Sequence, residues 1–418
     1  MANPEELGQQ WDARQLPRRG ISASEPVLRS DRRSARVRGI VQDGHAHSTR
    51  TPLARRDGAL EHAAVSPFAA IRRSRRALVA LALSFACGLM GCSAPRHGAP
   101  RPAPASHGGA LTLTVENDSF SGSDNNYTSG IGLGWSTDEV GNYGEGSFVR
   151  GWAELWSFLP FVLDEGHSTY ASWTVGQEMH TPDDISDPDP PPTDQPYAGV
   201  LYVDSILAAR GHDWEHRWSL RLGVVGPASQ ADDTQTWFHD VIGADEPMGW
   251  DQQLPNEPLI NLGYDAAYLL FERELGTSAK LRLVPVGGAA VGNYFTGANL
   301  GLYGEFGWNL VDAFGISALR GGFDTSSTIG VGPVEGWSVS FFGSVGGTGI
   351  AHYLPLDGTV FSDSRSVDSE PFVGSVSAGL TLRRGRFVLG FARTITTSAF
   401  ETQTENAEFG TVSISWFF

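Results

Sequence analysis

The chain has 418 residues, of which 30 are basic and 47 acidic, so its formal net charge is −17. Residues 1–76 hold 15 of the basic and 8 of the acidic residues, which leaves the rest of the chain with a net charge of −24. This acidic remainder of the chain excludes nucleic acid as a partner, because binding to phosphates requires an excess of Lys and Arg. The composition suits a secreted or surface protein that meets divalent cations.

The first 76 residues lack lysine and show little apolar periodicity, so they predict no folded domain. We interpret residues 1–76 as a basic extension that is either disordered or wrongly assigned to the chain. An uncharged apolar run, Ala77–Leu89, follows a cluster of arginines. This run is too short for a membrane-spanning helix, which needs about 20 apolar residues. Residues 77–92 therefore predict the hydrophobic region and cleavage site of a secretory signal peptide.

The end of this run, residues 89–92 (Leu-Met-Gly-Cys), resembles a bacterial lipobox with Cys92 as the acylated residue. Ordinary signal cleavage after the nearby small residues is the alternative. Cys87 and Cys92 are the two cysteines of the chain, so the body beyond the signal can form no internal disulfide. Residues 93–109 are rich in Pro, Ala, Ser and His and predict a tether.

From residue 110 onward, apolar residues alternate with small polar ones, which is the period of a β-strand. The pattern is clear in residues 111–115, 131–135 and 376–382. One face of each segment is apolar or aromatic, whereas a soluble sandwich would carry Lys and Glu on its other face. Here Gly, Ser and Thr occupy that face, which is typical of a barrel with lipid outside and a polar interior. Residues 110–418 therefore predict an all-β fold, a closed antiparallel transmembrane β-barrel of the bacterial outer membrane.

We count about twelve strands, an even number as in other closed bacterial barrels. They begin near Leu111, Tyr127, Thr169, Tyr197, Trp214, Pro258, Ala279, Ala298, Trp337, Pro371, Arg386 and Glu408. If the amino terminus is periplasmic, every odd-numbered connection lies outside the cell. These connections include Asn117–Asn126, Thr181–Gln195 and Gly226–Pro258, which we expect on one rim. The aromatic segment Glu145–Asp164 is interpreted as an amphipathic turn at the membrane boundary.

Within Gly226–Pro258 the apolar period changes from that of a strand to that of a helix. Pro227 in front and Gly243 behind are typical helix boundaries. Helical spacing produces an apolar stripe of Trp237, Phe238, Val241 and Ile242, and a neighbouring polar face of Asp232, Gln235, His239 and Gly243. A single helical insertion in a run of strands indicates a functional loop, and His239 lies in its middle.

Oxygen donors flank the first predicted hairpin, namely Asn117, Asp118, Asp124 and Thr128. Such residues also form ordinary polar turns, which is the simpler interpretation. A hard cation such as Ca²⁺ prefers these ligands, although their spacing does not match an EF-hand. His239 is either structural or a general base. The sequence contains no Gly-x-Ser-x-Gly elbow and no His-Glu-x-x-His helix, which disfavours an acyl-serine route and leaves ester hydrolysis by a metal and a base.

Five ordered blocks together resemble the lipid A 3'-O-deacylase family of outer-membrane barrels. The blocks are Glu116-Asn117-Asp118, Asp124…Tyr127-Thr128-Ser129-Gly130, Pro196-Tyr197-Ala198-Gly199, Gly226-Pro227…Gln235…His239…Gly243 and Gly249-Trp250-Asp251-Gln252-Gln253-Leu254. The similarity runs from about residue 111 to residue 257, and more loosely, by strand pattern, to the end of the chain.

The resemblance implies a twelve-stranded barrel whose calcium-dependent active site lies between the wall and the loop helix. The family's catalytic His corresponds to His239, and its Asn-Asp pair and Thr correspond to Asn117, Asp118 and Thr128. Its acidic residue after the His corresponds to Asp245, or to Glu246 if the loop is shifted. The implied calcium ligands are Asn117, Asp118, Thr128 and Asp245. Calcium would polarise the ester carbonyl of lipid A while His239 takes a proton from the attacking water.

One feature departs from the family pattern. Family members carry a Lys in the loop after the third strand, whereas His180–Pro196 contains neither Lys nor Arg. Divalent ions that bridge Asp183, Asp184 or Asp187 to a lipid A phosphate are one hypothetical substitute. A non-enzymatic barrel (a small pore or structural protein) and an outer-membrane phospholipase are the alternative functions. In each case we expect a monomer surrounded by outer-membrane lipids.

Overall fold

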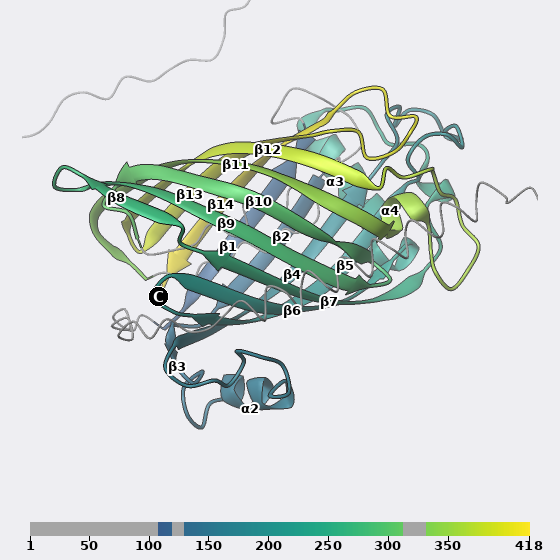
Figure 1. Cartoon of the computed structure of the whole chain (residues 1–418). Helices are drawn as coiled ribbons and strands as arrows, with labels where there is room; N and C mark the ends of the chain where they lie inside the picture. The colour runs from purple at the N-terminus through teal and green to yellow at the C-terminus, as the bar shows by residue number, and fades with distance from the viewer. Residues whose placement is uncertain (1–107, 119–128, 312–331) are drawn as a thin grey trace, which may run out of the picture. The chain divides into compact units, whose positions relative to one another are not determined.

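The structure of the protein is a computed structural model that describes residues 108–118, 129–311 and 332–418 (Figure 1). The predictions for residues 1–76, for the signal segment 77–92 and for nearly all of the tether 93–109 lie outside the described residues.

Within the described residues, twelve antiparallel strands form a closed ring (Figure 1). They are β1 Ala110–Asn117, β2 Ser129–Ser136, β4 Ser168–His180, β5 Ala198–Arg210, β6 Trp214–Val225, β7 Glu257–Tyr268, β9 Ala279–Gly292, β10 Phe295–Trp308, β11 Val334–Tyr353, β12 Phe372–Gly385, β13 Phe387–Thr396 and β14 Ala407–Phe417. Each strand pairs with the next in this series, and β14 pairs with β1, where Ala110 lies opposite Phe417. Ring closure satisfies the backbone hydrogen bonds that lipid cannot satisfy. The prediction of a twelve-stranded barrel is confirmed.

The remaining described elements are short. Strand β3 (Val140–Gly141) pairs with the start of β4, and β8 (Phe271–Leu275) pairs with the start of β9. The helices are α2 Phe148–Leu155, α3 Ala231–Ile242 and α4 Leu354–Asp357, together with the 3₁₀ helices η2 Pro227–Ser229 and η3 Trp250–Gln252. No helix among the described residues is long and apolar enough to cross a membrane.

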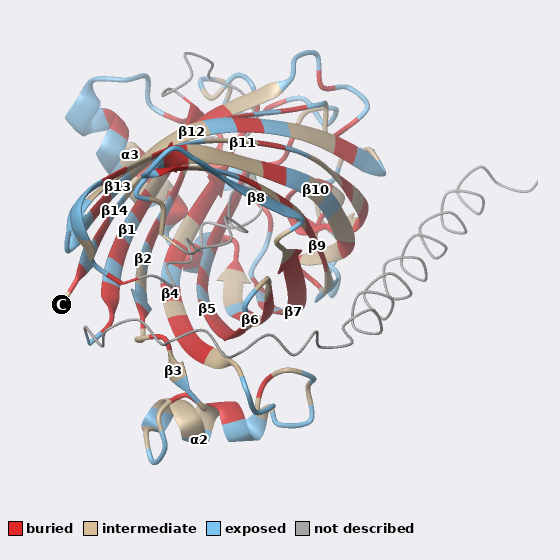
Figure 2. Ribbon diagram, turned by 60° about the vertical axis from the view of Figure 1, so that its left-hand side comes forward, coloured by how far each residue is buried: buried red, intermediate tan, exposed pale blue. Residues whose placement is uncertain are grey.

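Alternate residues of each strand face opposite sides of the barrel wall. On β1, Leu111 and Leu113 are exposed, whereas Thr112 and Thr114 are buried. The same alternation recurs around the ring, and Figure 2 shows it as changes of burial along single strands. The apolar residues therefore face outward, and the small polar residues face the lumen. This arrangement confirms the lipid-facing and interior faces predicted from the sequence.

Charged residues are buried in the lumen as compensated groups. The Arg221 guanidinium donates to Asp204 at 2.8 and 2.9 Å and to Glu178 at 3.0 Å, and it lies 3.7 Å from the Tyr202 ring centroid. The Tyr294 hydroxyl also donates to Glu178. Charges removed from water require such partners. The interior thus carries an ordered polar network.

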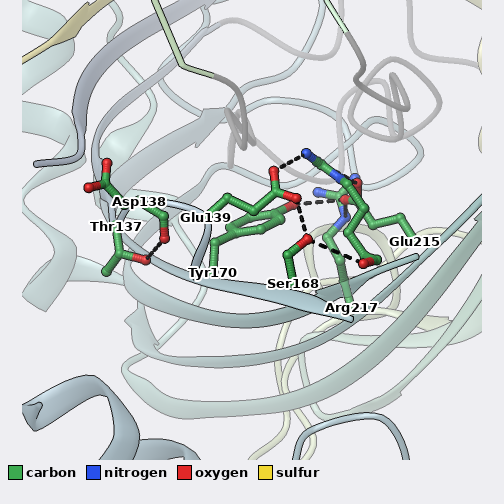
Figure 3. Close-up of polar contacts among 8 residues, drawn as sticks. Thr137, Asp138, Glu139, Ser168, Tyr170, Glu215 and Arg217 are labelled. Atoms are coloured by element: carbon green, nitrogen blue, oxygen red, sulfur yellow. Dashed lines mark hydrogen bonds and ion pairs between the residues drawn. The ribbon is translucent and has the colours of Figure 1, made fainter. Parts of the chain in front are cut away.

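A second buried network joins side chains of β4, β5 and β6 (Figure 3). Arg210 pairs with Glu139 at 2.7 Å and with Glu215 at 2.6 Å. The Tyr170 hydroxyl donates to the same Glu215 carboxylate at 2.7 Å, and Arg217 approaches it at 3.2 Å. These contacts connect β4, β5 and β6 through their side chains in addition to the backbone ladder.

The two ends of the barrel differ. The connections 181–197, 226–256 and 354–371 leave one end, which we call the α3 rim. The opposite rim carries α2, β3 and β8, and there the Phe418 amide donates to the Gly109 carbonyl at 3.2 Å. The described parts of the odd-numbered connections therefore share one rim, as predicted. An apolar cluster from the wall and the loops packs at this rim: Ala198, Val200, Tyr202, Val225, Leu254, Leu259, Tyr294, Ile350, Tyr353, Leu354, Leu356, Val373 and Phe400.

Candidate active site

Local sequence determines where helix α3 begins and ends. Gly226 (φ 95°) turns the chain out of β6 through a conformation that favours glycine, and η2 follows. Asp232 and Asp233 lie in the first turn of α3, where negative charge is favoured by the helix dipole. Gly243 (φ 71°) ends the helix in the left-handed conformation typical of a C-terminal cap. The predicted helix is therefore confirmed.

The two faces of α3 are placed opposite to the usual arrangement. Its buried residues, Ala231, Gln235 and His239, are spaced by four and lie on one face. The apolar stripe points away from the protein and is exposed: Trp237 by 65%, Phe238 by 39%, Val241 by 64% and Ile242 by 54%. A helix at a water-exposed surface would be expected to bury such a stripe. An apolar face outward and a polar face against the wall is the arrangement expected at a lipid boundary.

Helix α3 packs on the outer face of the barrel wall. Gly199 shares its face of β5 with the exposed residues Leu201 and Val203, so it points outward. A Cβ built on Gly199 would lie 2.3 Å from both the Ala231 Cβ and the Ser229 Oγ. The Gly226 amide donates to the Gly199 carbonyl at 2.9 Å. Glycine is required here because Ala231 of α3 and Ser229 of η2 approach the strand so closely.

A second set of contacts fixes the helix from its other side. The Trp250 indole N–H donates to Gln235 Oε1 at 2.8 Å, and the Trp250 and Tyr197 ring centroids are 4.9 Å apart. The Gln177 side chain donates to the Ser229 carbonyl at 2.7 Å. Gln235 Nε2 is buried and has no hydrogen-bond partner among the described residues. An amide donor is therefore available on the buried face of α3, one turn before His239.

His239 is held by the loop that follows its helix. Its Nδ1 atom lies 2.5 Å from the backbone carbonyl oxygen of Asp245, and its side chain is largely buried. A carbonyl oxygen only accepts hydrogen bonds, so Nδ1 carries the proton in this contact. In the neutral imidazole, Nε2 then has the lone pair. The contact therefore leaves Nε2 of a neutral His239 as the nitrogen that can accept a proton.

The predicted Asn117 lies on the same outer face as α3. In the antiparallel registers, Asn117 is opposite Ser129, Ser129 is opposite Met179, and Met179 is opposite Gly199. Residues directly opposite each other share one face of the sheet. Asn117 and Met179 are thus about 10 Å apart, since neighbouring strands are about 4.8 Å apart. Met179 in turn packs with Ala231 beneath α3.

The residues predicted to bind calcium are only partly described. Asn117, the last residue of β1, and Asp118, which follows it, lie at the α3 rim and are buried, with oxygen atoms of the kind that Ca²⁺ prefers. Asp245 is exposed, and its backbone carbonyl is what contacts His239. Thr128 and Asp124 lie outside the described residues. No group of three or more His, Cys, Asp or Glu residues suited to a metal occurs in the described part of the chain. Asn117 and Asp118 fit calcium in donor chemistry, and the complete ligand set stays a prediction.

The sequence patterns indicate no role for Gln177, Gly199 and Trp250, although the last two lie in blocks that carry the family resemblance. Gln177 could have been found from the pattern alone. It interrupts the outward row of β4 formed by Trp173, Val175 and Met179. A polar residue at a lipid-facing position indicates a contact that replaces lipid, here the α3 segment.

Fold and site together define an outer-membrane β-barrel whose candidate active site lies between the outer wall and a loop helix. The chain belongs to the family described as Outer membrane protein LpxR, whose model matches residues 79–418. Membership of this family supports an outer-membrane lipid A deacylase that acts on lipid A or lipopolysaccharide.

A solved structure supports the fold. LpxR from Salmonella typhimurium is similar with a TM-score of 0.61 and 18% sequence identity, and the match covers 74% of this chain and 100% of that one. The beta domain of the Bordetella autotransporter Brka matches with a TM-score of 0.36 and 11% identity, over 74% of this chain and 98% of that one. No curated protein matches the chain by sequence.

Proposed function

We propose that the protein hydrolyses the 3'-linked acyl ester of lipid A in a calcium-dependent reaction, with His239 as the general base. The observation that carries this proposal is the contact between His239 Nδ1 and the Asp245 carbonyl. It leaves Nε2 of the neutral ring as a base on the buried face of α3. An imidazole held in one tautomer by a backbone acceptor is the arrangement that general-base catalysis requires.

The reaction follows from the residues of this chain. His239 Nε2 takes a proton from a water molecule, and the water oxygen attacks the ester carbonyl carbon. The tetrahedral intermediate collapses as the proton passes to the departing sugar oxygen, which releases the free fatty acid. Gln235 Nε2 is buried and has no hydrogen-bond partner among the described residues, so it would donate to a substrate oxygen only where the ester enters beneath α3. Calcium bound near Asn117, Asp118 and Thr128 would supply positive charge for the developing oxyanion.

The position of α3 supports a lipid substrate. Its exposed apolar residues, Trp237, Val241 and Ile242, continue the apolar outer surface of the barrel at the α3 rim. Acyl chains of a lipid can contact this surface without leaving the membrane, while the ester lies near the buried polar face. A soluble polar substrate would gain no binding energy from contact with these exposed apolar side chains. This favours an ester of a membrane lipid.

The proposal can be tested by mass spectrometry of lipid A from cells that express the protein. Wild type should remove one 3'-linked acyl group, and His239→Ala should abolish this loss while the barrel remains heat-modifiable on gels. His212→Ala is the matched control, because His212 is an exposed turn residue at the opposite rim. Unchanged lipid A with assembled wild-type protein would favour the non-enzymatic barrel, and cleavage of phospholipid alone would favour a phospholipase.

A serine nucleophile is the other route to ester hydrolysis. Ser229 Oγ is buried against Gly199 beneath α3 and makes no hydrogen bond with a described residue, His239 included. Activation of a serine requires a base within hydrogen-bond reach. Ser229→Ala should therefore retain turnover, and loss of turnover in an assembled barrel would support the serine route.

A further inference from the structure

The segment 140–167, which we call the α2 appendage, packs on the outer wall at the opposite rim (Figure 1). The Trp152 indole donates to Ser205 Oγ at 2.9 Å, and the Trp218 indole of β6 donates to the Pro160 carbonyl at 2.9 Å. Ser205 and Leu207 lie on the outward face of β5, and Leu207 belongs to the apolar cluster formed with the appendage. The appendage therefore covers part of the surface that lipid would otherwise cover.

The apolar face of helix α2 is wider than the part of it that packs against the barrel wall. At 100° per residue, its apolar residues form one continuous arc, while Arg150 and Glu154 lie on the other side and form an ion pair at 2.9 Å. One edge of the arc is sealed against the wall, since Ala153 has 0% exposure. The other edge is open, with Phe148 exposed by 77% and Leu155 by 67%, and Phe158 just beyond the helix is exposed by 73%.

This open edge continues into the aromatic surface of the barrel. The Phe148 ring centroid lies 6.2 Å from that of Trp173 on β4. Trp173 stacks on Trp135 of β2 at 5.1 Å, and Trp135 is exposed on the outward face of its strand. Aromatic side chains in outer-membrane barrels gather where acyl chains meet headgroups. The exposed edge of α2 is thus at the depth of this boundary.

We propose that the α2 appendage is an interfacial membrane anchor, with Phe148, Leu155 and Phe158 inserted between the phospholipid headgroups and acyl chains of the leaflet at the opposite rim. An amphipathic helix with large apolar residues on one side and charged residues on the other lies in the plane of a membrane surface. The exposed edge of α2 contacts lipid, because it is continuous with the aromatic surface of the barrel wall, which faces lipid. The anchor fixes the depth of the barrel in the membrane independently of any activity at the α3 rim.

The proposal is tested with a fluorescent label at single cysteines in the full chain, after Cys87 and Cys92 are replaced by serine. The label is the environment-sensitive dye NBD, placed by Leu155→Cys or Phe158→Cys. The protein is reconstituted in phosphatidylcholine liposomes with or without brominated acyl chains. Glu154→Cys is the matched control on the polar side of the same helix, and Leu133→Cys reports a lipid-facing position on β2. Heat-modifiability confirms that each variant has assembled.

Labels at residues 155 and 158 should show a blue-shifted emission and be quenched by brominated lipid almost as strongly as the label at residue 133. The label at residue 154 should emit as in water and resist quenching. Equal, weak quenching at residues 154 and 155 would overturn the anchor. A blue shift at residue 155 without quenching by brominated lipid would also overturn it, because it would assign the edge to a second copy or another protein.

Discussion

Gly199 of β5 and Ala231 of α3 are in contact with no space for a single added carbon between them. The Cβ of an alanine at position 199 would lie 2.3 Å from the Ala231 Cβ, whereas non-bonded carbon atoms require about 3.5–4.0 Å. This one contact sets how close the helix that bears His239 comes to the wall. It connects the choice of glycine in a strand to the geometry of the site.

Gly199→Ala should therefore displace α3 from the wall by more than about 1 Å. A displacement of this size can reduce turnover on the order of 100-fold, because catalysis depends on the position of the base. Deacylation rates and heat-modifiability measured on the same sample separate loss of activity from loss of assembly. Gly141→Ala in β3 is the control, since a Cβ there meets no atom within 4 Å. Full activity of Gly199→Ala would show that the helix position is not critical.

Calcium removal tests the predicted role of Asn117 and Asp118. A chelator should stop turnover, and Asp118→Ala should raise the calcium concentration needed for half-maximal activity by about 10-fold or more. The matched control is Asp240→Ala, which removes an exposed carboxylate from α3 and should leave the calcium titration unchanged. Full turnover in the chelator would remove calcium from the proposed reaction.

The lumen network predicts a large effect on stability. Arg221→Met would leave the buried Glu178 and Asp204 carboxylates without their shared cation, which should lower the free energy of unfolding by about 3–5 kcal/mol. Arg150→Met removes an i,i+4 pair on the polar side of α2, in which the Glu154 side chain is 57% exposed, and solvent screening should keep its effect within about 1 kcal/mol. Urea unfolding in liposomes, followed by tryptophan fluorescence, measures both. Equal losses of unfolding free energy in the two variants would mean that the lumen pair is already well hydrated.

Arg365 is a candidate for the charge that the loop 181–197 lacks. Its Nη2 donates to the carbonyls of Pro190 and Pro191 at 2.5 and 3.1 Å. Both bonds use one nitrogen, so the guanidinium retains further donors for a phosphate. Arg365→Gln should raise KM for bisphosphorylated lipid A more than for lipid A lacking the 4'-phosphate.

The comparison of these two substrates is the critical control for Arg365. An equal increase of KM for the two substrates would mean that Arg365 only holds the loop through the Pro190 and Pro191 carbonyls. Arg365→Lys should retain part of the preference, because it keeps the positive charge but loses the planar arrangement of donors.

Much of the barrel could be predicted because its information is local. Alternation such as Leu111-Thr112-Leu113 depends on only two environments, lipid and lumen, and every strand repeats it. The predicted strand starts and the helix within Gly226–Pro258 were confirmed for the same reason. The sequence did not indicate which face of α3 meets the wall. At a lipid boundary the apolar face stays outward, which reverses the rule for soluble proteins.

The sequence by itself determined the membrane barrel, the rim that carries the long connections and the presence of His239 on a loop helix. Only the tertiary structure decided that Asn117, Met179 and Gly199 lie in one outward row and that His239 contacts the Asp245 carbonyl. The physical reason is the range of the interactions. Periodicity records what each residue faces, whereas strand register and the docking of α3 depend on contacts between segments far apart in the chain.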